Sequence, residues 1–129
     1  MTRHEEIASH FLNELDKHIA DIISGKIDQF YEIQDFAKIL CIHPVYLSNT
    51  VKEITGKAPC DHCEGKLAVE AKNLLLSSDM SITQIASLLT YDSSGFTKFF
   101  KKYVGQTPSS YRNQFHTKQK LSPVKEESI

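Results

Sequence analysis

The chain has 129 residues, of which 40% are hydrophobic and 24% are charged, and this composition excludes disordered, collagen-like and disulfide-stapled proteins. No apolar run reaches the about 18 residues that a membrane-spanning helix needs, and the amino terminus lacks a signal-peptide pattern. We therefore expect a cytoplasmic protein with no membrane partner. The formal net charge is −1, but residues 93–125 carry seven Lys or Arg and no Asp or Glu, whereas residues 1–40 carry four against eight. This basic segment either binds a polyanion such as a phosphate backbone or forms a solvated basic face.

Apolar residues recur at helical spacing over residues 5–24, which predicts a long leading helix that ends at Gly25. Some of them alternate between spacings of four and three, as in a coiled-coil seam. These residues are Ala8, Leu12, Leu15, Ile19 and Ile22. Two heptads are too short for a free coiled coil, so we expect this helix to pack on the next segment and the protein to be a monomer.

An internal repeat organises the middle of the chain. Residues 33–59 (IQDFAKILCIHPVYLSNTVKEITGKAP) align without a gap on residues 82–108 (ITQIASLLTYDSSGFTKFFKKYVGQTP), at an offset of 49 residues. Each copy has a short apolar stripe of helical period, a three-residue turn and a longer helix that ends at a glycine, Gly56 or Gly105. The repeat therefore predicts one supersecondary unit that is used twice.

Within each copy a small residue, Ala37 or Ala86, stands where the two helices must touch. A short helix, a tight turn and a longer helix form a helix-turn-helix motif, which we expect at residues 33–56 and again at residues 82–105. A plain helical hairpin would also bury apolar stripes. It would not repeat the alanine, the turn length, the glycine and the proline in register.

The remaining segments also read as helices. Residues 60–77 form a linker helix between the two motifs, and residues 108–115 form a short closing helix. Residues 117–129 lack apolar periodicity and are expected to be a disordered tail. This leaves one all-α domain over residues 1–116.

Over residues 5–115 the sequence resembles the DNA-binding domain of the AraC/XylS family of bacterial transcription regulators. The resemblance rests on IxDFAxxL with PVYLSNTVKEITGKAP, on EAKNLLL in the linker, and on SITQIASLL with FTKFFKKYVGQTPSSYR. It implies a seven-helix domain whose two recognition helices enter successive major grooves of double-stranded DNA. It also implies a regulator on the nucleoid with no cofactor and no catalytic activity. Many members of that family carry a separate sensor domain, and no segment of this sequence reads as one, so we expect either a free-standing regulator or a fragment. RNA polymerase is a candidate second partner.

The second turn departs from the family pattern. Thr90 and Tyr91 stand where the family commonly has Gly followed by Phe, so a glycine favoured for a left-handed conformation is missing. The turn is also one residue shorter than is usual in that family, which makes the two motifs equal in length.

Outward residues near the amino end of a recognition helix face base edges, while flanking cations reach phosphates. Asn49 could bond an adenine edge at two places, and Lys98 could reach guanine acceptors. The predicted base contacts are Val45, Tyr46, Ser48, Asn49, Ser94, Gly95, Thr97 and Lys98. The predicted phosphate contacts are Lys52, Lys57, Lys101, Lys102 and Arg112.

Two other functions compete with this interpretation. Cys60, His62 and Cys63 have a spacing that serves zinc or disulfide chemistry, but a closed zinc site needs four ligands, so we expect no metal. The resemblance places Cys63 where the family has a buried apolar residue, and therefore implies a packed thiol there. A helical protein-interaction module that keeps the fold is the other alternative. A hydrolase is not expected, because no nucleophile lies in a Gly-rich turn and the six His residues are scattered.

Overall fold

The computed structural model describes residues 1–115, so the tail predicted at residues 117–129 lies outside the described residues. The chain divides into two compact units, the first over Met1–Leu67 and the second from Ala68 onward. Every regular element within the described residues is a helix, which confirms the all-α fold class. Over the same residues, no helix is long and apolar enough to cross a membrane.

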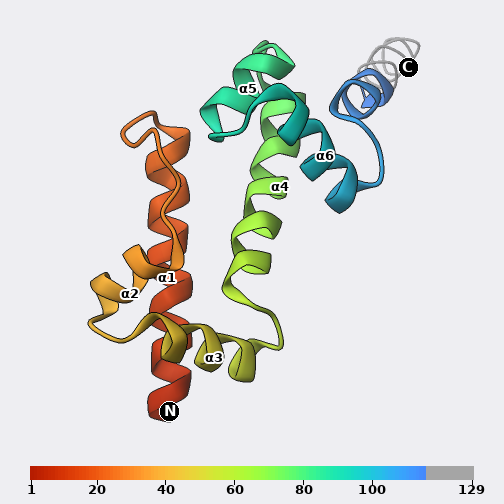
Figure 1. Cartoon of the computed structure of the whole chain (residues 1–129). Coiled ribbons are helices and arrows are strands. Elements are labelled where there is room, and N and C mark those ends of the chain that lie inside the picture. Colours follow the sequence, from red (N-terminus) through yellow and green to blue (C-terminus); the bar gives the residue numbers. More distant parts are fainter. Residues whose placement is uncertain (116–129) are drawn as a thin grey trace, which may run out of the picture. The chain divides into compact units, whose positions relative to one another are not determined.

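The first unit contains α1 (Arg3–Ile23), α2 (Ile33–Leu40), α3 (Pro44–Thr55) and the start of α4 (Pro59–Ser77) (Figure 1). A capping box starts α1, because the Thr2 hydroxyl accepts a hydrogen bond from the Glu5 amide while the Glu5 carboxylate accepts one from the Thr2 amide. The predicted leading helix thus begins two residues earlier than its sequence pattern indicated.

The apolar face of α1 packs on α2 and α3. Ala8, Leu15, Ile19 and Ile22 are buried within the unit, so most of the seam that suggested a coiled coil is used for intramolecular packing. The largest fully buried side chains that surround them are Phe11, Phe36, Leu47 and Val51. Ile54, near the end of α3, is 39% exposed.

The second unit contains the rest of α4, α5 (Ile82–Leu88), α6 (Ser93–Val104) and a helix over residues 108–115. Its core is aromatic: Phe96, Phe99 and Phe100 of α6 are buried, and the ring of Phe100 meets Tyr111 edge on at 5.5 Å between centroids. With this last helix, the described part of the chain contains the seven helices that the resemblance implied.

The turns of the two motifs have the same backbone conformation. Cys41 (φ 60°) and Thr90 (φ 72°) are left-handed although neither is a glycine, and they occupy equivalent positions of the repeat. In each turn this residue and the next donate their N–H groups to the preceding helix, as in a Schellman motif. The bonds run from Cys41 to Lys38, from Ile42 to Ala37, from Thr90 to Ser87 and from Tyr91 to Ala86.

Candidate nucleic-acid interface

Helix α3 is the second helix of the first motif, and both of its ends are fixed locally. Pro44 occupies the first helical position, where its missing N–H leaves no donor unpaired. The preceding residue, His43, caps the helix with a ring nitrogen (Nδ1) that accepts from the Val45 amide at 3.1 Å. Gly56 ends the helix at φ 81°. Helix α6 begins at the equivalent position of the repeat, Ser93, and is likewise followed by a left-handed glycine, Gly105.

The amino half of α3 presents the side chains that we predicted as base contacts. Val45 is 59% exposed, Tyr46 is 40% exposed, and Asn49 is also exposed, whereas Ser48 is half-buried. Helical spacings of three and four place Val45, Ser48, Asn49 and Lys52 on one side of the helix. The structure therefore brings three of these predicted base contacts and one predicted phosphate contact together.

The amino end of α6 is arranged differently. The Asp92 carboxylate accepts from the Gly95 amide at 2.6 Å, and a Cβ atom at residue 95 would lie only 2.7 Å from that carboxylate oxygen. The hydroxyl of Thr97 donates to the Ser93 carbonyl at 3.0 Å. Gly95 and Thr97 thus have local structural roles that the sequence pattern did not reveal, while Ser94 and Lys98 are exposed.

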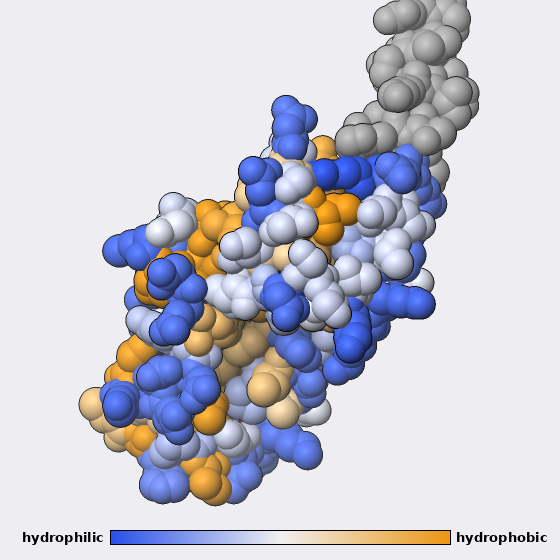
Figure 2. Space-filling model, turned by 45° about the horizontal axis from the view of Figure 1, so that its top comes forward, coloured by the Kyte–Doolittle hydropathy of each residue, from blue (hydrophilic) through white to orange (hydrophobic). Residues whose placement is uncertain are grey.

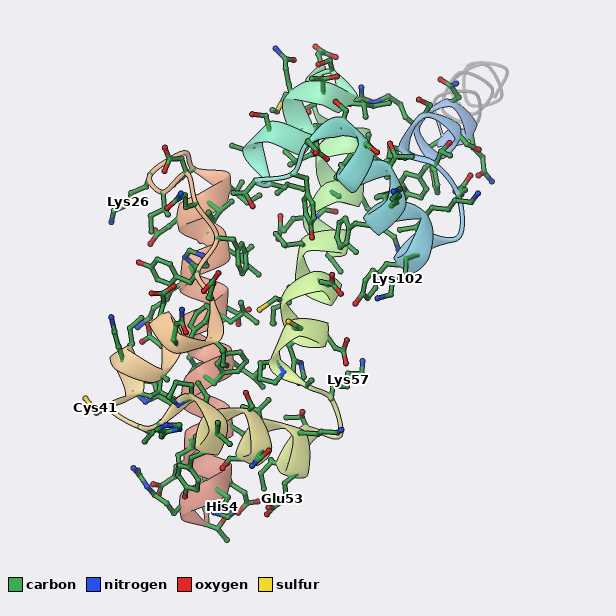
Figure 3. The ribbon with its side chains drawn as sticks, in the orientation of Figure 1. His4, Lys26, Cys41, Glu53, Lys57 and Lys102 are labelled. Atoms are coloured by element: carbon green, nitrogen blue, oxygen red, sulfur yellow. The ribbon has the colours of Figure 1, made fainter. Side chains whose placement is uncertain are left out.

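Four of the five predicted phosphate contacts are exposed: Lys52, Lys57, Lys101 and Lys102. Figure 3 shows Lys57 after α3 and Lys102 on α6, and the Lys102 ammonium lies 5.3 Å from the centroid of the Tyr103 ring. Figure 2 shows that hydrophilic residues cover much of the visible face, with hydrophobic residues exposed in separate patches.

Arg112 differs from these lysines. Its Nε donates to the Leu75 carbonyl at 2.9 Å and its Nη2 to the Ser78 carbonyl at 3.3 Å. The guanidinium therefore donates to carbonyl groups at the carboxyl end of α4, because the last carbonyl groups of a helix have no donor within the helix. No sequence pattern indicates this role, because the donor and its acceptors lie more than 30 residues apart.

The turn before Lys57 is held by one hydroxyl. Thr55 Oγ1 lies within hydrogen-bonding distance of the Val51 carbonyl, of both backbone groups of Lys57 and, at 2.7 Å, of His62 Nε2 in α4. Burial, together with the charges of Lys57 and Lys66, lowers the pKa of His62. His62 is thus a structural residue of the corner between α3 and α4.

The cysteines in this region do not have the properties of a reactive pair. Burial raises the pKa of the Cys63 thiol to about 12, so the thiolate that metal binding and disulfide exchange require is disfavoured. Cys60 is exposed, and both are free thiols. Among residues 1–115 no group of three or more His, Cys, Asp or Glu is placed to hold a metal ion.

The two recognition helices differ in charge. Helix α6 carries Lys98, Lys101 and Lys102 and no acidic residue, whereas α3 carries Lys52 and Glu53. In the repeat, Glu53 is equivalent to Lys102. Figure 3 shows Glu53 facing His4 of α1, and the Glu53 Oε1 and His4 Nδ1 atoms are 3.1 Å apart. Sequence reasoning missed this pair, since nothing in the repeat connects α1 to α3.

A family model described as "Helix-turn-helix domain" matches residues 36–114. The chain is 33% identical over 89 residues to the uncharacterized HTH-type transcriptional regulator YobQ of Bacillus subtilis, a match that covers 68% of this chain and 37% of that protein. It is 31% identical over 84 residues to the MmsAB operon regulatory protein of Pseudomonas aeruginosa, covering 64% of this chain and 27% of that protein. The chain thus spans well under half the length of these curated relatives.

Two solved structures share the fold. The C-terminal domain of AraT, a response regulator from Geobacillus stearothermophilus, gives a TM-score of 0.75 at 26% identity, with 88% of each chain covered. The DNA-binding domain of AdpA, solved in complex with a target DNA, gives a TM-score of 0.69 at 18% identity, with 81% of this chain and 94% of that chain covered.

Two helix-turn-helix motifs joined through one helix define the class of the protein as a double helix-turn-helix domain. The chain belongs to the AraC-type helix-turn-helix family of DNA-binding transcription regulators.

Proposed function

We propose that the chain binds double-stranded DNA in a sequence-specific way, with α3 and α6 as recognition helices that enter successive major grooves. The observation that supports this is the equivalence of the two helices. Each begins and ends at the same position of the repeat, buries its apolar side, and exposes polar side chains near its amino end. That is the presentation by which helix-turn-helix proteins read base edges.

The proposed contacts follow from exposure and charge. Base edges are read by Val45, Tyr46, Ser48 and Asn49 on α3 and by Ser94, Gly95, Thr97 and Lys98 on α6. Phosphates are bound by Lys52, Lys57, Lys101 and Lys102, and the amino-terminal amides of the recognition helices add further donors. Arg112 is left out of this set, because its guanidinium already bonds two carbonyls of its own unit.

The proposal extends to the setting in which the domain works. The chain acts in the cytoplasm on the nucleoid as a transcription regulator without enzymatic activity, and RNA polymerase is its second partner. It acts as a monomer, since the apolar face of α1 packs within the first unit. Sedimentation at micromolar concentration checks the last point, and a species of twice the mass of 14.6 kDa would contradict it.

A selection of bound sequences from a random duplex pool, followed by salt titrations of alanine variants, tests the function. Lys98→Ala should weaken binding to the selected duplex by roughly 1 to 3 kcal/mol and leave binding to a random duplex nearly unchanged. Lys101→Ala should weaken binding to both duplexes. Equal losses from both variants on both duplexes would contradict this division, and a failure of the wild-type chain to bind any duplex would favour a protein-interaction module.

A further inference from the structure

The first turn of α1 lies beside the exposed side of α3, within the first unit. The His4 imidazole lies 3.1 Å from the Glu53 carboxylate and meets the Tyr46 ring edge on, at 5.8 Å between centroids and 70° between planes. The same turn and the end of α3 line a shallow groove formed by Thr2, Arg3, His4, Glu5, Glu53 and Ile54. His4 therefore touches two residues of a recognition helix from outside the motif.

The spacing along α3 shows where this contact falls. Tyr46, Asn49 and Glu53 are separated by three and then four residues, so they follow one side of the helix. His4 spans the two ends of that row, and Asn49 lies between them. Because Tyr46 is 40% exposed, the core does not fully enclose its ring, and a contact such as the one with His4 limits its motion.

A carboxylate in a DNA-reading helix is electrostatically unfavourable, which makes Glu53 unusual. The equivalent position of α6 carries Lys102, a cation suited to phosphate. The first motif carries a carboxylate at this position instead of a cation, and the Glu53 carboxylate lies within hydrogen-bonding distance of His4. The pairing gives Glu53 a role that phosphate binding does not explain, namely to fix the orientation of the imidazole.

We infer that His4 is a positioning residue for base reading by the first motif: Glu53 orients the imidazole, and the edge of the imidazole holds Tyr46 toward the DNA. This inference rests on the proposed function. An edge-on aromatic contact changes a conformational equilibrium by about 2- to 10-fold, so its loss should appear in specificity at that scale. The amino-terminal turn of α1 is thereby part of the first recognition surface.

The test measures the ratio of the dissociation constant for a random duplex to that for the selected duplex, at one salt concentration. Nonspecific charge effects cancel in this ratio. His4→Ala should lower it by about 2- to 10-fold, and Tyr46→Ala by at least as much. The double variant should match Tyr46→Ala alone within about twofold, because His4 acts through Tyr46. His10→Ala is the matched control, since His10 lies on the same helix but pairs with Glu14 of α1.

Repeating the selection of bound sequences with each variant gives a second measurement, the base preference at each position. A change in folding stability alone would not alter that preference. The base pairs whose preference relaxes in Tyr46→Ala should relax in His4→Ala as well, while those that depend on Lys98 should not. An unchanged ratio in His4→Ala, or a loss that adds in full to that of Tyr46→Ala, would overturn the inference. The inference would also be overturned if Tyr46→Ala left the ratio unchanged while Asn49→Ala or Lys98→Ala lowered it. That result would leave the proposed function intact. A wild-type chain without any sequence preference would instead overturn the proposed function.

Discussion

His18 of α1 is a buried histidine with an incomplete set of hydrogen bonds. It is 3% exposed, and its Nε2 accepts from the Tyr31 amide at 3.0 Å, while the buried Nδ1 has no hydrogen-bond partner among residues 1–115. The His18 ring stacks on the Tyr31 ring, with 3.9 Å between the ring centroids, and meets the Phe30 and Phe36 rings edge on. Accepting at Nε2 requires the neutral imidazole, so the proton resides on Nδ1. His18 thus ties the segment before α2 to α1 in its uncharged form.

This geometry predicts a loss of stability in mild acid. Burial lowers the pKa of His18, against smaller opposing effects of Asp21 and Asp35. The folded state therefore disfavours protonation, whereas the unfolded chain takes up the proton below a pH of about 6.5. The contribution is fully present above that pH and is lost as the pH falls toward the lowered pKa. The free energy of unfolding should decrease below pH 6.5, with a slope of at most about 1.4 kcal/mol per pH unit from this group.

Urea titrations between pH 5.5 and 7.5 measure this slope. His18→Gln should flatten it, although His62, whose pKa is also lowered, retains part of the effect. A slope that His18→Gln does not change would show that His18 is not the group that titrates.

At the scale of elements, the end of α4 depends on a single distant side chain. Arg112→Ala removes the donors to the Leu75 and Ser78 carbonyls. Hydrogen bonds from a charged donor contribute about 1.5 to 3 kcal/mol, so the variant should lose stability on that order. Urea unfolding measures the change. Arg112→Lys is the matched control: it keeps the charge but not the fork of donors, and it should recover only part of the loss. If both variants kept the full stability and Arg112→Ala bound random DNA more weakly, Arg112 would be a phosphate contact, as its sequence position first suggested.

The turns of the two motifs give a second prediction at this scale. A left-handed residue that is not glycine costs roughly 1 to 2 kcal/mol, and Thr90 is β-branched, which makes its φ of 72° especially unfavourable. Thr90→Gly should therefore raise the free energy of unfolding by about 1 kcal/mol. Gly105→Ala is the inverse control, because φ is 89° there and no atom of the described residues lies within 4 Å of an added Cβ. It should lower stability by a similar amount in the same urea titration. Loss of stability in Thr90→Gly would mean that its side chain stabilises the turn.

The helices themselves were largely predictable from sequence, because the residues that determine helix boundaries lie close to those boundaries in the chain. The apolar stripes, Pro44, Gly56 and Gly105 act within a few residues of the helix boundaries that they set. The family resemblance marked the position of Thr90 as one where a left-handed glycine is common, and Thr90 is left-handed although threonine is a poor residue for that conformation. Contacts between distant segments were not predictable. Arg112 with α4 and His4 with α3 arise only when separate elements pack, and no periodicity encodes them.

At the scale of the whole chain, charge is divided between the two units. Residues 1–67 carry seven Lys or Arg against eleven Asp or Glu, whereas residues 68–115 carry five against three. Long-range attraction to a polyanion should therefore come mainly from the second motif, and the more acidic first motif should contribute more through base contacts. The two motifs are thus structurally equivalent repeats with unequal electrostatic roles.

The salt dependence of DNA binding separates these roles. Each phosphate contact contributes about 0.9 to the slope of log affinity against log salt concentration on duplex DNA. Lys101→Gln with Lys102→Gln should therefore reduce the slope on a random duplex by about 1.8. Lys52→Gln with Lys57→Gln should reduce it by less than half as much, because Glu53 beside Lys52 already weakens phosphate binding there. Both pairs remove two charges, so they are matched in net charge. Equal reductions would show that the two motifs bind the phosphate backbone equally, and a larger reduction from the Lys52 and Lys57 pair would reverse the assignment.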